Sequence, residues 1–109
     1  MKVKELIELI NNAKLYSLWD ADELIHNDVN LVECYLNSHS HELYDLSTNI
    51  YKCDDGYVGV EGLFSLKSEN MNYIDCGISC SASEFIAIPT ITYKQKNINY
   101  ETSHCGPIN

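Results

Sequence analysis

The sequence predicts an α+β domain in which N-terminal helices pack on an antiparallel sheet of three or four strands. Apolar residues recur at helical spacing near the N-terminus, whereas alternating and β-branched runs separated by short turns occupy most of the remainder. A length of 109 residues and a hydrophobic fraction of 45% favour one folded domain. We expect this domain to span residues 1–96, and residues 97–109, which lack periodicity, to form a loose tail.

The first helix is expected over residues 2–14. Apolar residues there follow the i, i+3, i+4, i+7 spacing of an amphipathic helix: Val3, Leu6, Ile7, Ile10 and Ala13. A further short helical turn is expected over residues 31–36, from the spacing of Leu31, Val32, Tyr35 and Leu36. Residues 37–41 are polar and are expected to form a loop.

A second helix is expected over residues 20–27. Asp20 and Glu23 have the spacing of a capping box, with the Asp20 carboxylate as N-cap and Glu23 at the third helical position. Trp19 before this cap and Leu24 after it have the spacing of a hydrophobic staple, which fixes the direction in which the chain enters the helix.

The clearest local signal is a β-hairpin centred on Asp54-Asp55-Gly56. A two-residue turn at Asp55-Gly56 would pair Tyr51 with Val60, whereas a three-residue loop with a left-handed Gly56 would pair Ile50 with Val60. The second register gathers the apolar residues on one face, so it is preferred. The other face would then carry an aromatic and acidic set: Tyr51, Tyr57, Asn49, Glu61 and Leu63.

Two more strands are expected after a polar loop over residues 67–73. Alternation of apolar and small polar residues over 76–82 has the period of a half-buried strand. Residues 85–93 form a second apolar, β-branched run, which Pro89 restricts to an edge position or a bulge.

The chain is strongly acidic, and its charge is unevenly distributed. Seven lysines and no arginine stand against sixteen acids, which gives a formal charge of −9. The segment between Leu15 and Tyr51 holds seven of these acids and no lysine. Such a field repels phosphates and attracts cations or basic protein surfaces. Nucleic-acid binding, which depends on dense lysine and arginine, is therefore not expected.

The sequence carries no recognisable catalytic motif, so we expect a protein that is not an enzyme and that uses no cofactor. Five cysteines are an odd number, which favours free thiols over a disulfide framework. On one strand, Cys76 and Cys80 would lie roughly 13 Å apart, too far to share a metal ion. A metal- or cysteine-dependent protein that uses Cys34, His39 and His41 remains an alternative.

The location of the protein is also constrained by the sequence. No apolar run approaches the roughly 20 residues of a membrane span. Glu5 and Glu8 interrupt the apolar run that a secretion signal would need. We therefore expect a cytoplasmic protein that does not contact membranes.

The acidic segment and the tyrosines together predict a protein-binding surface. Eight tyrosines make up most of the aromatic residues, and tyrosine is enriched at protein interfaces. The predicted partner is a basic protein. The candidate partner-binding residues are Asp20, Asp22, Glu23, Asp28, Glu33, Tyr51, Tyr57 and Glu61.

The whole chain resembles the cytoplasmic immunity proteins of bacterial toxin–immunity pairs, including those of contact-dependent growth inhibition. The resemblance lies in its small size, its acidity, its free cysteines, its lack of motifs and an amino-acid composition typical of AT-rich genes. The resemblance implies an inhibitor that binds a basic, often nuclease-type, toxin domain and blocks its active site or its access to substrate. It implies no particular fold and no residue roles. A second class stays open: a small regulatory or adaptor module, or a homodimer formed through an open sheet edge.

Overall fold

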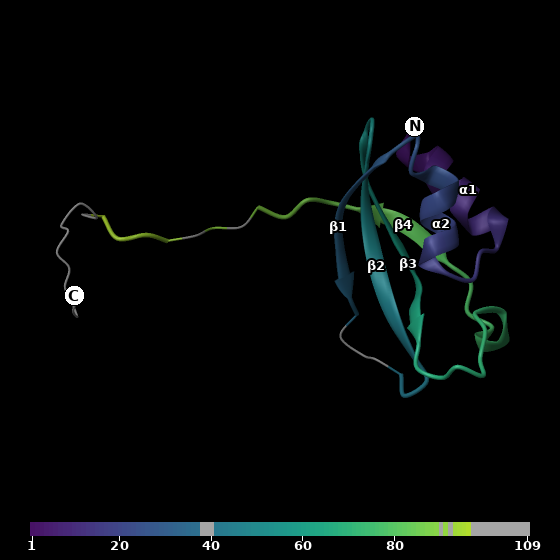
Figure 1. Ribbon diagram of the computed structural model, residues 1–109. Coiled ribbons are helices and arrows are strands. Elements are labelled where there is room, and N and C mark those ends of the chain that lie inside the picture. The colour runs from purple at the N-terminus through teal and green to yellow at the C-terminus, as the bar shows by residue number, and fades with distance from the viewer. Residues whose placement is uncertain (38–40, 90, 92, 97–109) are drawn as a thin grey trace.

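The structure is a computed structural model that describes residues 1–37, 41–89, 91 and 93–96. Two helices precede a four-stranded antiparallel sheet, which confirms the predicted α+β class (Figure 1). The elements are α1 (Val3–Ala13), α2 (Leu18–Ile25), β1 (Asn30–Leu36), β2 (Tyr44–Cys53), β3 (Gly56–Leu66), the 3-10 helix η1 (Ile74–Cys76) and β4 (Ser81–Phe85).

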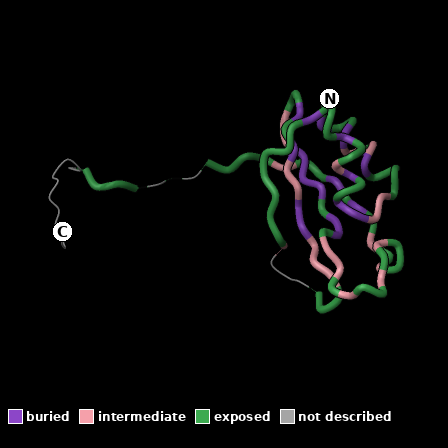
Figure 2. The backbone as a smooth tube through the Cα atoms, viewed as in Figure 1, coloured by how far each residue is buried: buried purple, intermediate pink, exposed green. Residues whose placement is uncertain are grey.

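The strands follow one another across the sheet in the order β1-β2-β3-β4, each antiparallel to its neighbour. Helix α1 packs on β3 and β4, and α2 packs on β3, so both helices cover one face of the β3–β4 half. All seven residues of β1 are exposed, whereas most of the central residues of β3 are buried (Figure 2). Strand β1 is therefore an exposed edge of the sheet, at the side away from β4.

The core lies between the two helices and the sheet. Fully buried side chains come from α1 (Leu6, Ile10), α2 (Ile25) and β3 (Val58, Val60). Each such aliphatic side chain contributes roughly 1.5–3 kcal/mol when it leaves water. Leu6 and Ile10 are four residues apart on one face of α1, and Leu18 and Ile25 are seven residues apart on one face of α2. Val58 and Val60 are two residues apart on one face of β3, so all of these side chains point into the same core.

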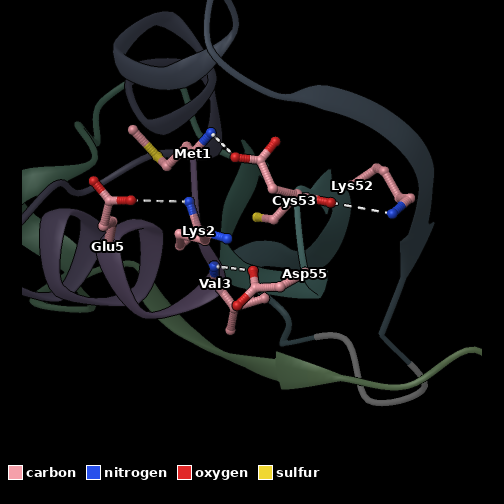
Figure 3. A network of polar contacts seen from close by, with 8 residues as sticks. Met1, Lys2, Val3, Glu5, Lys52, Cys53 and Asp55 are labelled. Atoms are coloured by element: carbon pink, nitrogen blue, oxygen red, sulfur yellow. Dashed lines mark hydrogen bonds and ion pairs between the residues drawn. The ribbon is translucent and has the colours of Figure 1, made fainter.

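Helix α1 forms where it was predicted, and its start is tied to the β2–β3 turn. The Met1 ammonium lies 3.0 Å from Asp54 Oδ2, and the Val3 amide donates a 2.8 Å hydrogen bond to Asp55 Oδ1 (Figure 3). The Lys2 amide donates to the Glu5 carboxylate in the first turn. The two turn carboxylates thus satisfy amide and ammonium groups at the start of α1.

Helix α2 begins at Leu18, two residues before the predicted start. Ser17 is the N-cap, and its hydroxyl accepts a 3.2 Å hydrogen bond from the Asp20 amide. The predicted Asp20–Glu23 capping box and the Trp19–Leu24 staple are therefore wrong. Serine caps helices as well as aspartate does, and a start at Leu18 also buries that side chain against the core.

Residues 31–36 lie in β1 and do not form the predicted helical turn. The strand pairs with β2, with an irregularity between Leu31 and Glu33 that inserts one extra residue. The prediction was wrong because Leu31, Val32, Tyr35 and Leu36 fit helical spacing by coincidence. Pairing with the long strand β2 supplies backbone hydrogen bonds that the local pattern does not reveal.

The hairpin is present, but both expected registers are wrong. Cys53 pairs with Gly56 and Tyr51 pairs with Val58, so the turn residues are Asp54 and Asp55. This shift places Tyr51 on the helix-covered face, where its side chain is fully buried. The bonds from Asp54 and Asp55 to the start of α1 are the non-local contacts that accompany this register.

The last strand is shorter than predicted and differently placed. Residues 76–80 belong to η1 and a loop, β4 spans Ser81–Phe85, and the described residues of 86–96 are not in a strand. A Cβ atom on Gly59 would lie 2.3 Å from the Phe85 ring, and one on Gly62 would lie 2.7 Å from Cys80 Sγ. The missing side chains of Gly59 and Gly62 therefore leave room for Phe85 of β4 and for Cys80, the residue before β4. The predicted tail, residues 97–109, lies outside the described residues.

Candidate protein-binding surface

The acids of α2 form the first part of the candidate surface. Asp20 and Glu23 are exposed, and Asp28 is exposed in the turn that follows the helix. The described ion pairs join the Met1 ammonium to Asp54 and Lys67 to Asp45, so in the described part of the chain no lysine neutralises these three acids. An open hollow of about 390 Å³ lies beside them, lined by Leu15, Asp20, Glu23 and Leu24.

Trp19 lies among these acids and is 58% exposed. Its Nε1 donates a 2.9 Å hydrogen bond to the Phe64 carbonyl, and its ring stacks on the Phe64 ring at a centroid distance of 5.3 Å. The indole is thus held in place although more than half of it faces solvent. We call the exposed set on and after α2 the α2 surface, and its members are Trp19, Asp20, Glu23, Leu24 and Asp28.

Asp22 and Tyr51 were predicted to bind a partner, but the structure joins them to each other. The Tyr51 hydroxyl donates a 2.8 Å hydrogen bond to Asp22 Oδ1 and also accepts one from the Asn49 amide. Burial, together with the bond to Asp22, raises the pKa of the Tyr51 hydroxyl well above its ordinary value of 10.0. Since Tyr51 is 0% exposed, it holds α2 on the sheet and is not available to a partner.

Glu33, Tyr57 and Glu61 lie on the opposite face of the sheet. Glu33 pairs with Ile50, whose side chain alternates with that of the helix-facing Tyr51. The Lys52 ammonium lies 5.1 Å from the centre of the Tyr57 ring, and the Glu61 carboxylate accepts a hydrogen bond from the Asn37 amide. These three residues therefore do not join the α2 surface.

A groove separates α2 from β1 on the helix-covered face. Two adjoining hollows of about 170 and 140 Å³ share Cys34, Asn49 and Phe64 in their walls. We call this feature the α2–β1 groove. Its other lining residues are Leu18, Trp19, Asp22, Leu31, Tyr35, Leu36 and Ser47. The groove is lined mainly by apolar atoms, with the Asp22 carboxylate on the α2 side.

The thiols and histidines do not converge in the described part of the chain. No group of three or more His, Cys, Asp and Glu side chains there is placed to hold a metal ion. His41 stacks on Tyr44, and its Nδ1 accepts a hydrogen bond from the Leu43 amide; His39 lies outside the described residues. Burial raises the pKa of the Cys80 thiol to about 11 and also raises that of Cys53, so both stay protonated at neutral pH.

Trp19 is a member of the α2 surface that was not among the predicted partner-binding residues. The predicted staple would have placed it before the helix, whereas the observed start at Leu18 places it in the first turn. The sequence did contain a reason to select it: it is a single tryptophan beside several acids, and tryptophan is frequent at binding hot spots.

No helix in the described ranges is both long and apolar enough to cross a membrane. No protein-family model, no curated protein and no solved structure matches this chain.

Proposed function

We propose that the chain is an acidic protein-binding inhibitor, and specifically an immunity protein that neutralises a basic, nuclease-type toxin domain in the cytoplasm. The α2 surface carries this proposal. It combines a firmly held, exposed tryptophan with three carboxylates, in a segment that holds no lysine. The class-level resemblance in size and charge supports the toxin as the partner.

The proposed mechanism has an electrostatic and an apolar component. The net charge of −9 would steer a basic domain toward the chain and speed association. Asp20, Glu23 and Asp28 would occupy lysine and arginine side chains that otherwise bind substrate phosphates. Trp19 and Leu24 would supply the desolvated centre of the contact, and the existing hydrogen bond and stacking of Trp19 reduce the entropy lost on binding.

The first experiment identifies the partner. The full chain, carrying an affinity tag, is expressed in its native host and purified at low salt, and co-purifying proteins are identified by mass spectrometry. We expect one basic protein, encoded beside this chain and released by added salt. Recovery of the chain without any basic partner would contradict the proposal.

The second experiment tests the α2 surface against that partner. The variant Asp20→Asn/Glu23→Gln/Asp28→Asn is compared with Glu8→Gln/Glu69→Gln/Glu84→Gln, which removes three exposed charges elsewhere and so has the same net charge. Calorimetric titration should show the first variant binding roughly 10- to 100-fold more weakly, with a shallower salt dependence. Equal weakening of both variants would show that only the overall field matters, and the assigned surface would then be wrong.

A further inference from the structure

Strand β1 is a sheet edge that exposes several large apolar side chains. Among the described residues it pairs with β2 alone. Leu31, Tyr35 and Leu36, which all border the α2–β1 groove, are 48%, 43% and 62% exposed. An edge strand with free backbone groups and exposed apolar side chains is a template for a further strand.

The residues after β4 have the chemistry of such a strand. Ile86, Ile88, Ile91 and Tyr93 are between 75% and 91% exposed, and the described parts of 86–96 run away from the body in extended form (Figure 1). Exposed large apolar side chains that lie close together on one segment are typical of a binding site. We call the described residues of 86–96 the post-β4 segment.

The post-β4 segment and the β1 edge complement each other. Residues 86–93 are one residue longer than the seven-residue β1, and alternation would place Ile86 and Ile88 on one face and Ile91 and Tyr93 on the other. The described residues of the segment include Lys94 and Lys96 and no acid, whereas β1 carries Glu33 and lies across the groove from Asp22. Pro89 lacks an amide hydrogen, which an outermost strand tolerates.

We propose that the post-β4 segment of one copy docks along β1 of a second copy, over Leu31 and Leu36 on the β1 side of the α2–β1 groove, and that the exchange is reciprocal. The occupant is a second copy because β4 lies at the opposite edge of the sheet. Three inter-strand spacings separate β4 from β1, roughly 14 Å, and crossing them would use about four residues. Within one chain, Ile86 and Ile88 would lie in the crossing and could not pair with β1. In a two-fold exchange, both residues can pair with β1 of the other copy, and the assembly closes as a dimer.

Sedimentation velocity of the full chain, with a reductant present, tests self-association over a wide concentration range. We expect a monomer–dimer equilibrium. Leu36→Asp and Ile88→Asp should each weaken dimerisation at least tenfold, because each places a carboxylate in the apolar contact. Ile74→Asp is the matched control, because Ile74 is 68% exposed in η1, away from both partners of the contact. A monomer at every concentration would overturn the proposal, as would equal effects of all three variants.

The identity of the docked segment is tested by isotope-filtered nuclear Overhauser spectra of a mixture of labelled and unlabelled chains. We expect contacts between copies that join the Ile86 and Ile88 methyl groups to those of Leu31 and Leu36. Contacts found only within one copy would show that the segment covers its own edge, and the proposal would fail. This inference does not depend on the toxin partner, since it is tested without one.

Discussion

At the scale of single residues, the Tyr51–Asp22 hydrogen bond connects the acidic helix to the sheet. Tyr51 is fully buried in β2, and its hydroxyl is 2.8 Å from the Asp22 carboxylate. Asp22 thus has a structural role, whereas the other two carboxylates of α2, Asp20 and Glu23, are exposed. The distribution of charge along the sequence does not show that Asp22 differs in this way from Asp20 or Glu23.

Removing this hydroxyl should destabilise the fold. Tyr51→Phe leaves the half-buried Asp22 without its donor, and we expect the free energy of unfolding to fall by roughly 1–2 kcal/mol. Urea unfolding at neutral pH measures the change. Tyr57→Phe, a half-buried tyrosine on the other face, is the control and should have a smaller effect. Equal losses in the two variants would contradict the structural role of the Asp22 bond.

The buried thiols and Tyr51 should make the protein sensitive to alkaline pH. Burial raises the pKa of Cys80 to about 11 from its ordinary value of 9.0, and the pKa values of Cys53 and Tyr51 are raised as well. The folded state therefore holds these protons when the unfolded chain has begun to lose them. Stability should be constant with respect to these groups below pH 9.0 and fall as pH rises from there toward 11.

Thermal unfolding in a reducing buffer, followed from neutral to alkaline pH, checks this dependence. Cys80→Ala should lower stability at neutral pH through lost packing, and its stability should then fall less steeply above pH 9.0. Cys76→Ala, which changes a thiol that is only half buried, serves as the comparison. If stability fell equally steeply above pH 9.0 in Cys80→Ala and in the unaltered protein, the Cys80 thiol would not be a cause of the alkaline sensitivity.

At the scale of elements, the sequence predicted those features that depend on local chemistry. The amphipathic spacing of α1 and the aspartate-glycine turn between β2 and β3 each identify their element without tertiary information. Strand β1 was missed because its stability comes from pairing with β2. The hairpin register was wrong because Asp54 and Asp55 are engaged by the start of α1, more than fifty residues earlier in the chain.

The candidate surface was predictable to a similar degree. Local charge density correctly identified Asp20, Glu23 and Asp28 as exposed acids on and after one helix. It could not show that Glu33, Tyr57 and Glu61 lie on the other side of the sheet, because that depends on the register of β1 and β2. Nor could it show that Tyr51 is buried, since a shift of one residue exchanges the two faces of a strand.

At the scale of the whole molecule, two acids of the α2 surface, Glu23 and Asp28, are expected to oppose folding. The last turn of α2 contains no basic residue, and Glu23 and Asp28 lie near its C-terminus, where the helix dipole disfavours negative charge. The same two carboxylates belong to the proposed binding surface. If they are kept for binding, their contributions to stability and to partner affinity should have opposite signs.

The variant Glu23→Gln/Asp28→Asn tests this opposition directly. At low salt we expect it to raise the free energy of unfolding by roughly 0.5–1 kcal/mol, because it removes repulsion and an unfavourable dipole contact, and the gain should shrink as salt screens both. Glu69→Gln/Glu84→Gln changes the net charge equally at exposed sites and should give a smaller gain in the free energy of unfolding.

Urea unfolding at two salt concentrations measures the stability of both variants, and titration with the basic partner measures the affinity that Glu23→Gln/Asp28→Asn should lose. A variant that gains stability and keeps its full affinity would show that Glu23 and Asp28 do not serve binding, and the proposed contact would then have to rest on Trp19 and Asp20.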